Sequence, residues 1–248
     1  MMDKTLIESA ANRIRAARQT GRISDLPPDL IPRDEAQAYA IQDILLPAEE
    51  IAGWKVAPAS PTKGHRGSPM SVQAVIPDGG ALPQSAVAPE VEGEVGFVLS
   101  KPVPLDGTRE DVLDAIAGLC LAIEVLDSCF TDRKCADPMS ALADFQSNAG
   151  VVIGPLKTDL TGLDLSRLRP VFLTSDGETL EPAKPMALTE AVLDAVLWLA
   201  RHAARRDRPL QPGQVVITGA RVGPVPIARG QTFRVEADGF QGAAIRRD

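Results

Sequence analysis

Apolar residues recur at helical spacing near the start of the chain. A first stripe ends at Gly21, a residue typical of a helix C-terminus, and its members are Leu6, Ile7, Ala10, Ile14 and Ala17. After a proline-rich connector, a second helix is predicted over residues 34–46. These two helices indicate a small helical N-terminal region over residues 1–50, which leaves residues 51–248 as the main domain.

Two further helices are predicted later in the chain. One begins after Thr108, which with Asp111 resembles a capping box, and ends near Gly118. The other spans residues 188–206 and has one apolar face, formed by Val192, Val196, Leu199 and Ala203.

The segments between these helices have the composition of β-strands. Asp176-Gly177 is typical of a hairpin tip, and the predicted strand segments are residues 95–100, 119–128, 149–154, 170–180, 214–219 and 232–246. Because strands dominate and few helices alternate with them regularly, a doubly wound parallel sheet is disfavoured.

Three glutamates alternate at the start of one strand segment, in "EVEGEV". In an extended strand, Glu90, Glu92 and Glu94 would share one face at a spacing of about 6.6 Å. A half-exposed strand shows the same alternation, with Val91 and Val95 inward and the acids in water. If the acids are not solvated, their mutual repulsion requires a positive charge nearby.

A fourth glutamate interrupts a strongly apolar segment, "LCLAIEVLDS". A lone ionised Glu124 buried there would be costly, so it requires a cation, a basic partner or protonation. A structural salt bridge is the simplest explanation, but Asp127 adds more negative charge three residues later. Hard divalent metals prefer oxygen ligands, and such an ion would reconcile converging carboxylates.

Composition and charge limit the possible partners. The chain has 248 residues, 44% of them hydrophobic, with a net charge of −7 and a pI near 5.0. An acidic chain without a large basic cluster is a poor candidate for binding nucleic acid or anionic membranes. No segment has the length of a membrane span, and the N-terminus lacks the features of a signal peptide, so we expect a cytoplasmic protein.

The cysteines and histidines are too few and too scattered for a zinc site or a disulfide framework. Cys120, Cys129 and Cys135 are an odd number in a chain large enough to fold without disulfides, so reduced thiols are expected. His65 is expected in a solvated loop, and His202 near a helix C-terminus, where positive charge is favourable.

Five motifs together resemble the 2-keto-4-pentenoate hydratase and 2-oxo acid (4-oxalocrotonate) decarboxylase group of the fumarylacetoacetate hydrolase superfamily. Each motif is weak alone, but all five occur in the order found in that group, over almost the full length. They are "GWKVA" at 53–57, "VEGEVGFVL" at 91–99, "AIEVLDS" at 122–128, "ADFQSNAGVVIG" at 143–154 and "PGQVVITG" at 212–219.

The resemblance implies a set of site residues. It makes Glu92, Glu94 and Glu124 the ligands of Mg²⁺ or Mn²⁺, and leaves Glu90 facing solvent or supporting the site. The catalytic residues it implies are Lys55, Asp144 and Ser147, and the substrate-binding residues are Thr218, Gly219 and Asp127. Lys55 would bind a negative oxygen of the substrate, or transfer a proton if desolvation lowers its pKa.

The resemblance also implies an α+β fold, with a mixed β-roll or distorted-barrel core, flanking helices and a homo-oligomeric assembly. The implied activity is a metal-dependent hydratase, a lyase of the meta-cleavage catabolism of aromatic compounds, acting on a small 2-hydroxy-2,4-dienoic or 2-oxo acid through a metal-stabilised enolate. Two alternatives stay open, a 2-oxo diacid decarboxylase of the same family and a non-catalytic member that binds a metabolite or partner enzyme.

Three departures from the family pattern keep those alternatives open. Cys129 and Phe130 follow "DS", where the family commonly continues with arginine, and Phe145 follows Asp144 in place of asparagine. An acid that many hydratases carry between the lysine and the glutamate pair is missing, although Asp78 follows shortly afterwards in "IPDGGA".

Overall fold

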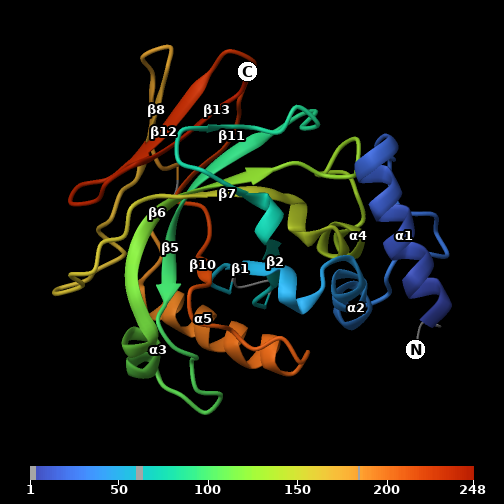
Figure 1. Cartoon of the computed structure of the whole chain (residues 1–248), viewed down its shortest axis with the longest axis horizontal. Coiled ribbons are helices and arrows are strands. Elements are labelled where there is room, and N and C mark those ends of the chain that lie inside the picture. The colour runs from blue at the N-terminus through green and yellow to red at the C-terminus, as the bar shows by residue number, and fades with distance from the viewer. Residues whose placement is uncertain (1–3, 60–63, 184) are drawn as a thin grey trace.

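The computed structural model describes residues 4–59, 64–183 and 185–248, and the first three residues of the predicted N-terminal helical segment lie outside this part. Its helices are α1 (Lys4–Thr20), α2 (Glu35–Leu45), α3 (Arg109–Ala115), α4 (Pro138–Ala143) and α5 (Thr189–Ala204). They flank two β-sheets, one of which is strongly curved (Figure 1). No helix in the described part of the chain is long and apolar enough to cross a membrane.

The larger sheet has the strand order β2-β1-β10-β5-β6-β7-β3, and β11 also pairs with β5. Its strands are β1 (Ile51–Val56), β2 (Gly67–Ser71), β3 (Val75–Ile76), β5 (Glu90–Leu99), β6 (Ile116–Leu126), β7 (Asn148–Ile153), β10 (Val215–Ile217) and β11 (Val222–Pro226). The β1–β10 and β3–β7 pairs are parallel and the others antiparallel. The sheet is therefore mixed, and the prediction of an α+β fold with a curved β core is confirmed.

The smaller sheet has the order β4-β13-β12-β8-β9 and packs against β5 and β6 of the larger one (Figure 1). Its strands are β4 (Gly80–Ala81), β8 (Val171–Thr174), β9 (Thr179–Leu180), β12 (Thr232–Glu236) and β13 (Ala243–Arg246). Phe172 and Phe233 from this sheet form an edge-to-face pair, with ring centroids 5.4 Å apart, within a core that includes Val91 and Ile123 of the larger sheet. This shared core joins the two sheets.

The long β5–β6 ladder is the centre of the molecule, and it is buried on both faces for most of its length. Close packing explains Gly93, because a Cβ atom there would lie 2.6 Å from Val222 Cγ1 and 3.0 Å from Val235 Cγ2. The ladder can therefore be covered tightly by neighbouring strands.

The helices form two groups around the larger sheet. α1, α2 and α4 share one hydrophobic cluster, which contains Ile14, Ile41, Phe130 and Leu142, while α5 packs against β1 and α3 (Figure 1). α5 also contacts α2, because the rings of Tyr39 and His202 lie 4.3 Å apart. The N-terminal helices thus pack on a segment from the middle of the chain. The proposed division at residue 50 stays a prediction.

The predicted helices and strands are found with small shifts. The helix after Thr108 keeps its capping box but ends at Ala115, and Gly118 lies inside β6, so the predicted end near Gly118 is wrong. A Cβ at Gly118 would lie 2.7 Å from both Leu156 Cγ and Lys157 O, so this glycine permits a close crossing of the chain. The pattern did not predict β1, β2, β11 or α4, which are short or contain proline or glycine.

Candidate metal centre and active site

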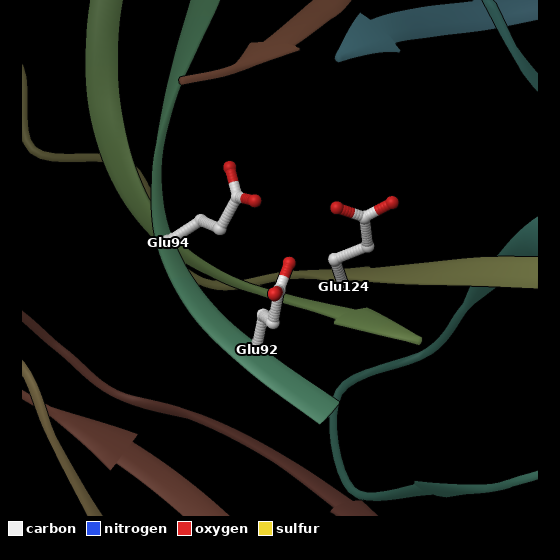
Figure 2. A group of neighbouring side chains, drawn as sticks. All are labelled: Glu92, Glu94 and Glu124. Atoms are coloured by element: carbon white, nitrogen blue, oxygen red, sulfur yellow. The ribbon is translucent and has the colours of Figure 1, made fainter. Parts of the chain in front are cut away.

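Three glutamates from two neighbouring strands converge inside the curved sheet. Glu92 lies directly opposite Glu124 in the antiparallel β5–β6 register, and Glu94 is two residues further along the same face of β5. One carboxylate oxygen from each residue lies within 4.8 Å of the others. Figure 2 shows the three carboxylates pointing toward a common space. We call this group the glutamate triad.

Burial and mutual repulsion both disfavour three negative charges here. Glu94 is 1% exposed and Glu124 0% exposed, while Glu92 is partly buried. Burial, followed by repulsion from Glu124, raises the pKa of Glu92 to about 6. Burial and the charges of Glu124 and Glu92 also raise the pKa of Glu94 well above its ordinary value. A cation at the triad would remove this penalty.

Lys55 supplies one positive charge, from the end of β1. Its Nζ donates to Glu124 Oε1 at 2.5 Å and to the main-chain oxygen of Gln146 at 3.4 Å. Burial acts to lower the Lys55 pKa, but Glu124, Glu92 and Glu94 outweigh it, so this pKa lies above its ordinary value. The condition for proton transfer by Lys55, a pKa lowered by desolvation, is therefore not met, because the triad more than compensates for the lost hydration. Lys55 is a cation at neutral pH.

The two oxygens of Glu124 have unequal surroundings. Oε1 accepts from Lys55 and, at 2.8 Å, from Asn148 Nδ2. Oε2 is buried and has no hydrogen-bond partner among the described residues. A buried carboxylate oxygen without a donor is costly, so its position suits a ligand.

The turn from α4 into β7 holds the lysine and Asn148 in place. Phe145, Gln146 and Ser147 all have left-handed backbone conformations, with φ values of 55°, 53° and 66°. Such conformations are unfavourable for residues with side chains and occur most often at functional sites. Gln146 accepts hydrogen bonds through both its main chain and its side chain. Its main-chain oxygen accepts from Lys55, and its Oε1 accepts from Ser68 Oγ at 2.9 Å.

The loop after β10 contacts the third glutamate. The main-chain N–H of Gly219 donates to Glu94 Oε2 at 2.7 Å, and Gly219 has a φ of +94°. Thr218 is fully buried, and its Oγ1 donates to the Val95 oxygen at 2.8 Å. Thr218 and Gly219 therefore lie at the triad, although Thr218 uses its hydroxyl within the protein.

Asp144 and Ser147 lie in the turn beside the triad, but Asp144 is directed elsewhere. Its buried carboxylate accepts from Arg18 Nε at 2.7 Å, Ser128 Oγ at 2.6 Å and Cys129 N at 3.0 Å. Ser147 accepts from the N–H of Asp127 through its main-chain oxygen. The structure thus does not bring the Asp144 carboxylate into the triad, and both residues shape the turn that holds Lys55.

Asp127 and Glu90 form ion pairs away from the triad. Asp127 pairs with Arg22, and its other oxygen accepts from Val87 N at 3.3 Å. Glu90 pairs with Arg133 and, at 3.0 Å, with Lys134. Glu90 is therefore neither simply solvated nor part of the triad, because two basic residues of the loop after β6 neutralise it.

Three other sequence expectations have clear outcomes. Asp78 does not replace an active-site acid, because its Oδ1 accepts from Ala244 N at 2.7 Å in the smaller sheet. His65 lies in a loop, where Nδ1 is 3.1 Å from the Ala57 oxygen. His202 does not favour positive charge, because burial and the neighbouring Arg206 lower its pKa to about 4.

Three further residues near the triad or Lys55 were not predicted from the sequence: Asn148, Gln146 and Arg221. Arg221 is 5% exposed, and burial lowers its pKa while Glu94 acts in the opposite direction. Asn148 and Gln146 lie within the quoted "ADFQSNAGVVIG" motif, so the motif offered a signal for them. Arg221 offered none, since an arginine two residues after a strand-ending Thr-Gly is ordinarily a surface residue.

Known proteins are similar to this chain over most of its length. Residues 54–246 match the family model described as fumarylacetoacetate (FAA) hydrolase C-terminal. The chain is 31% identical to "2-keto-4-pentenoate hydratase" of Burkholderia vietnamiensis, with 97% of each chain covered. It is 28% identical to "2-hydroxyhexa-2,4-dienoate hydratase" of Comamonas testosteroni, with 99% of each covered.

A solved structure matches the whole fold. It is "4-oxalocrotonate decarboxylase from Pseudomonas putida G7", complexed with magnesium and adipate, with a TM-score of 0.85 and 25% identity. The match covers 100% of this chain and 99% of the other. The N-terminal helices are therefore part of the shared architecture.

Proposed function

Because the chain belongs to the fumarylacetoacetate (FAA) hydrolase family, we propose that it is a divalent-metal-dependent lyase that hydrates a small 2-hydroxy-2,4-dienoic or 2-oxo acid. Relatives covered over nearly their whole length are named as hydratases of such acids. The observation that carries the proposal is the glutamate triad with a buried lysine in direct contact. Such acids arise in the meta-cleavage catabolism of aromatic compounds, and we assign the protein to that role.

The triad has the properties of a binding site for Mg²⁺ or Mn²⁺. It offers only oxygen donors, which both ions prefer. Glu124 Oε2 is buried without a partner in the described part of the chain. Burial and the neighbouring glutamates raise the pKa values of Glu92 and Glu94, and a bound cation would offset this effect. Glu92, Glu94 and Glu124 would hold the ion, which when bound supplies a Lewis acid for the keto and carboxylate oxygens of the substrate.

Lys55 gives the site its own positive group. As a largely buried cation, its ammonium can bind a negative oxygen of the substrate. Asn148 and Gln146 hold Glu124 and Lys55 in a fixed relation, so the ammonium is positioned before substrate binds. Asp144 and Ser147 act through the turn, and we assign them a positioning role. Of the substrate-binding candidates, Gly219 and Thr218 border the triad, whereas Asp127 is engaged by Arg22.

A 2-oxo diacid decarboxylase is the second candidate. It is favoured by the full-length match to a decarboxylase with a TM-score of 0.85. The same cluster of three carboxylates and a lysine serves either outcome, because both reactions pass through an enolate. The two differ in the group that leaves or adds, and the triad does not distinguish them.

The proposal is tested by turnover. Purified protein with Mg²⁺ is given 2-hydroxypenta-2,4-dienoate, the conjugated enol form of 2-keto-4-pentenoate, and the loss of its absorbance is followed. Release of carbon dioxide from 4-oxalocrotonate is measured in parallel. Hydration without carbon dioxide supports the proposal, and carbon dioxide release supports the decarboxylase. Oxalate binding by calorimetry without turnover of either substrate contradicts both and favours a non-catalytic binding protein. Glu124→Gln removes one of the three carboxylates and should reduce turnover. Glu49→Gln, a change at an exposed glutamate, is the matched control.

We further propose a homo-oligomer that acts in the cytoplasm. Light scattering after size-exclusion chromatography tests the assembly, and a monomer at micromolar concentration would contradict it. Fractionation of the cells that produce the protein tests the location.

A further inference from the structure

Arg221 is a buried arginine beside the triad, and its side chain forms an unusual set of hydrogen bonds. Its Nη1 donates to the main-chain oxygens of Thr218, at 3.1 Å, and Gly219, at 2.7 Å. Its Nη2 donates to Thr218 Oγ1 at 3.2 Å. Its Nε is shielded from solvent and has no hydrogen-bond partner in the described part of the chain. Arg221 thus uses only its terminal nitrogens, and it uses them on a single turn.

The surroundings of Arg221 make its burial costly. Among the residues that the structure describes, no carboxylate forms an ion pair with it, and a buried charge without a direct partner is unfavourable. The charge that opposes this penalty is that of Glu94, with which Arg221 interacts electrostatically.

Arg221 connects to Glu94 on two sides. Its main-chain N–H donates to the Gly93 oxygen at 2.8 Å, immediately before Glu94 in β5. Its guanidinium bonds the Gly219 oxygen, and the N–H of Gly219 donates to Glu94 Oε2 at 2.7 Å. Gly219 has a left-handed φ of +94°, so the direction of this N–H depends on the turn that Arg221 holds.

We propose that Arg221 is a positioning residue for the metal centre. Its guanidinium fixes the turn at Thr218 and Gly219, so that the Gly219 amide orients the Glu94 carboxylate toward Glu92 and Glu124 (Figure 2). The inference rests on the proposed function in one respect, that Glu94 is a metal ligand.

The two buried cations therefore have separate tasks. Lys55 contacts Glu124 directly, whereas Arg221 acts on Glu94 through the main chain. Partners that orient a metal ligand typically contribute 10–100-fold to metal affinity. An arginine suits this task because its planar guanidinium presents its donors in a fixed geometry, whereas the three donors of a lysine rotate about a single nitrogen.

The test measures Mn²⁺ binding alone, by calorimetry and by the Mn²⁺ electron paramagnetic resonance spectrum, on the full-length protein. We expect Arg221→Met to weaken Mn²⁺ binding about 10–100-fold, with an altered spectrum, and Arg221→Lys to restore only part of the loss. Arg247→Met is the matched control, because Arg247 also bonds main-chain oxygens, those of Ile227, Ala86 and Val87. It should bind Mn²⁺ within about twofold of the unmodified protein, since Arg247 contacts none of the triad.

The outcomes separate this inference from the proposed function. If Glu124→Gln abolishes Mn²⁺ binding but both Arg221 variants bind as the unmodified protein does, the positioning role is overturned and the metal centre stands. If Glu124→Gln also leaves Mn²⁺ binding unchanged, the metal centre itself is wrong. A loss of thermal stability without a loss of affinity in Arg221→Lys also overturns the inference, and that variant decides the question if Arg221→Met does not fold.

Discussion

Two buried acidic centres of the molecule, Asp144 and the glutamate triad, differ in how their charges are satisfied. Asp144 is fully buried, and both its oxygens accept hydrogen bonds, from Arg18, Ser128 and the Cys129 amide. The glutamate triad gathers three carboxylates around one directly bonded lysine and leaves Glu124 Oε2 without a donor among the described residues. Burial is common to both centres, and only the shortage of donors marks the triad as a site.

The pKa directions express the same difference. Burial acts to lower the Arg18 pKa, but the charge of Asp144 and its hydrogen bond to Arg18 outweigh burial, so the Arg18 pKa is raised. At the triad, burial and repulsion raise the pKa values of Glu92 and Glu94. Asp144 therefore stabilises the fold as it stands, whereas the triad becomes favourable only when a cation joins it.

The largest effect is expected for Glu124→Gln. Loss of one of three charged ligands should weaken Mn²⁺ binding by at least about 100-fold, because outer partners alone contribute 10–100-fold. Turnover at fixed metal should fall at least as much. The stability of the metal-free protein should not fall comparably, since the change also removes repulsion. Calorimetry, a turnover assay and urea unfolding measure these quantities, with Glu49→Gln as the control.

Lys55→Met should separate catalysis from metal binding. We expect turnover to fall by about 100-fold or more, because Lys55 provides the cation for the substrate oxygen. Mn²⁺ affinity should stay the same or increase, since a competing positive charge has gone. Weaker Mn²⁺ binding in this variant would contradict the role of Lys55. Lys101→Met, a change at an exposed lysine, is the matched control.

Asp144→Asn should show the opposite profile. Breaking its network leaves Arg18 without its charged partner, and because Arg18 is 31% exposed at its side chain we expect a loss of about 2–3 kcal/mol in the free energy of unfolding. That corresponds to a fall of roughly 5–10 °C in melting temperature. Mn²⁺ affinity should change by less than about twofold. A large loss of affinity with unchanged stability would place Asp144 in the site, and the exposed Asp106 in Asp106→Asn is the control.

The smallest effect concerns His202, which belongs to neither centre. It stacks on Trp198 and contacts Tyr39, with ring centroids 4.6 Å and 4.3 Å away, and its pKa is lowered from 6.5 to about 4. As the pH falls, His202 is protonated in the unfolded chain, near pH 6.5, before it is protonated in the folded protein, near pH 4. The contribution of His202 to stability is therefore present above pH 6.5 and is lost as the pH falls toward 4.

Unfolding by urea at several pH values measures this loss. Between pH 7 and pH 5 the unmodified protein should lose on the order of 1–2 kcal/mol more than His202→Gln. Equal pH dependence of the two proteins would show that His202 is not buried as a neutral group.

The sequence predicted the acids of the triad better than their surroundings. Alternation in "EVEGEV" placed Glu92 and Glu94 on one face, and the apolar run around Glu124 indicated a buried charge. The alignment of Glu92 with Glu124 depends on strand register, which the two segments do not encode separately.

The supporting residues could be predicted only in part. Asp144 was expected at the site because the family resemblance implied it, but its partner Arg18 lies 126 residues away, in α1. Arg221 has no local pattern at all, since its role depends on the turn at Gly219 meeting Glu94 across the sheet. Contacts between distant segments decide which buried acid is saturated, and such contacts appear only in the folded chain.

The central claim is that Glu92, Glu94 and Glu124 hold one divalent ion. Crystals soaked in Mn²⁺ and measured for anomalous scattering test it most directly. We predict one strong anomalous peak, with an oxygen of each glutamate at roughly 2.1 Å. Saturating Mn²⁺ that leaves no peak between these three carboxylates, or places it elsewhere, would contradict the account.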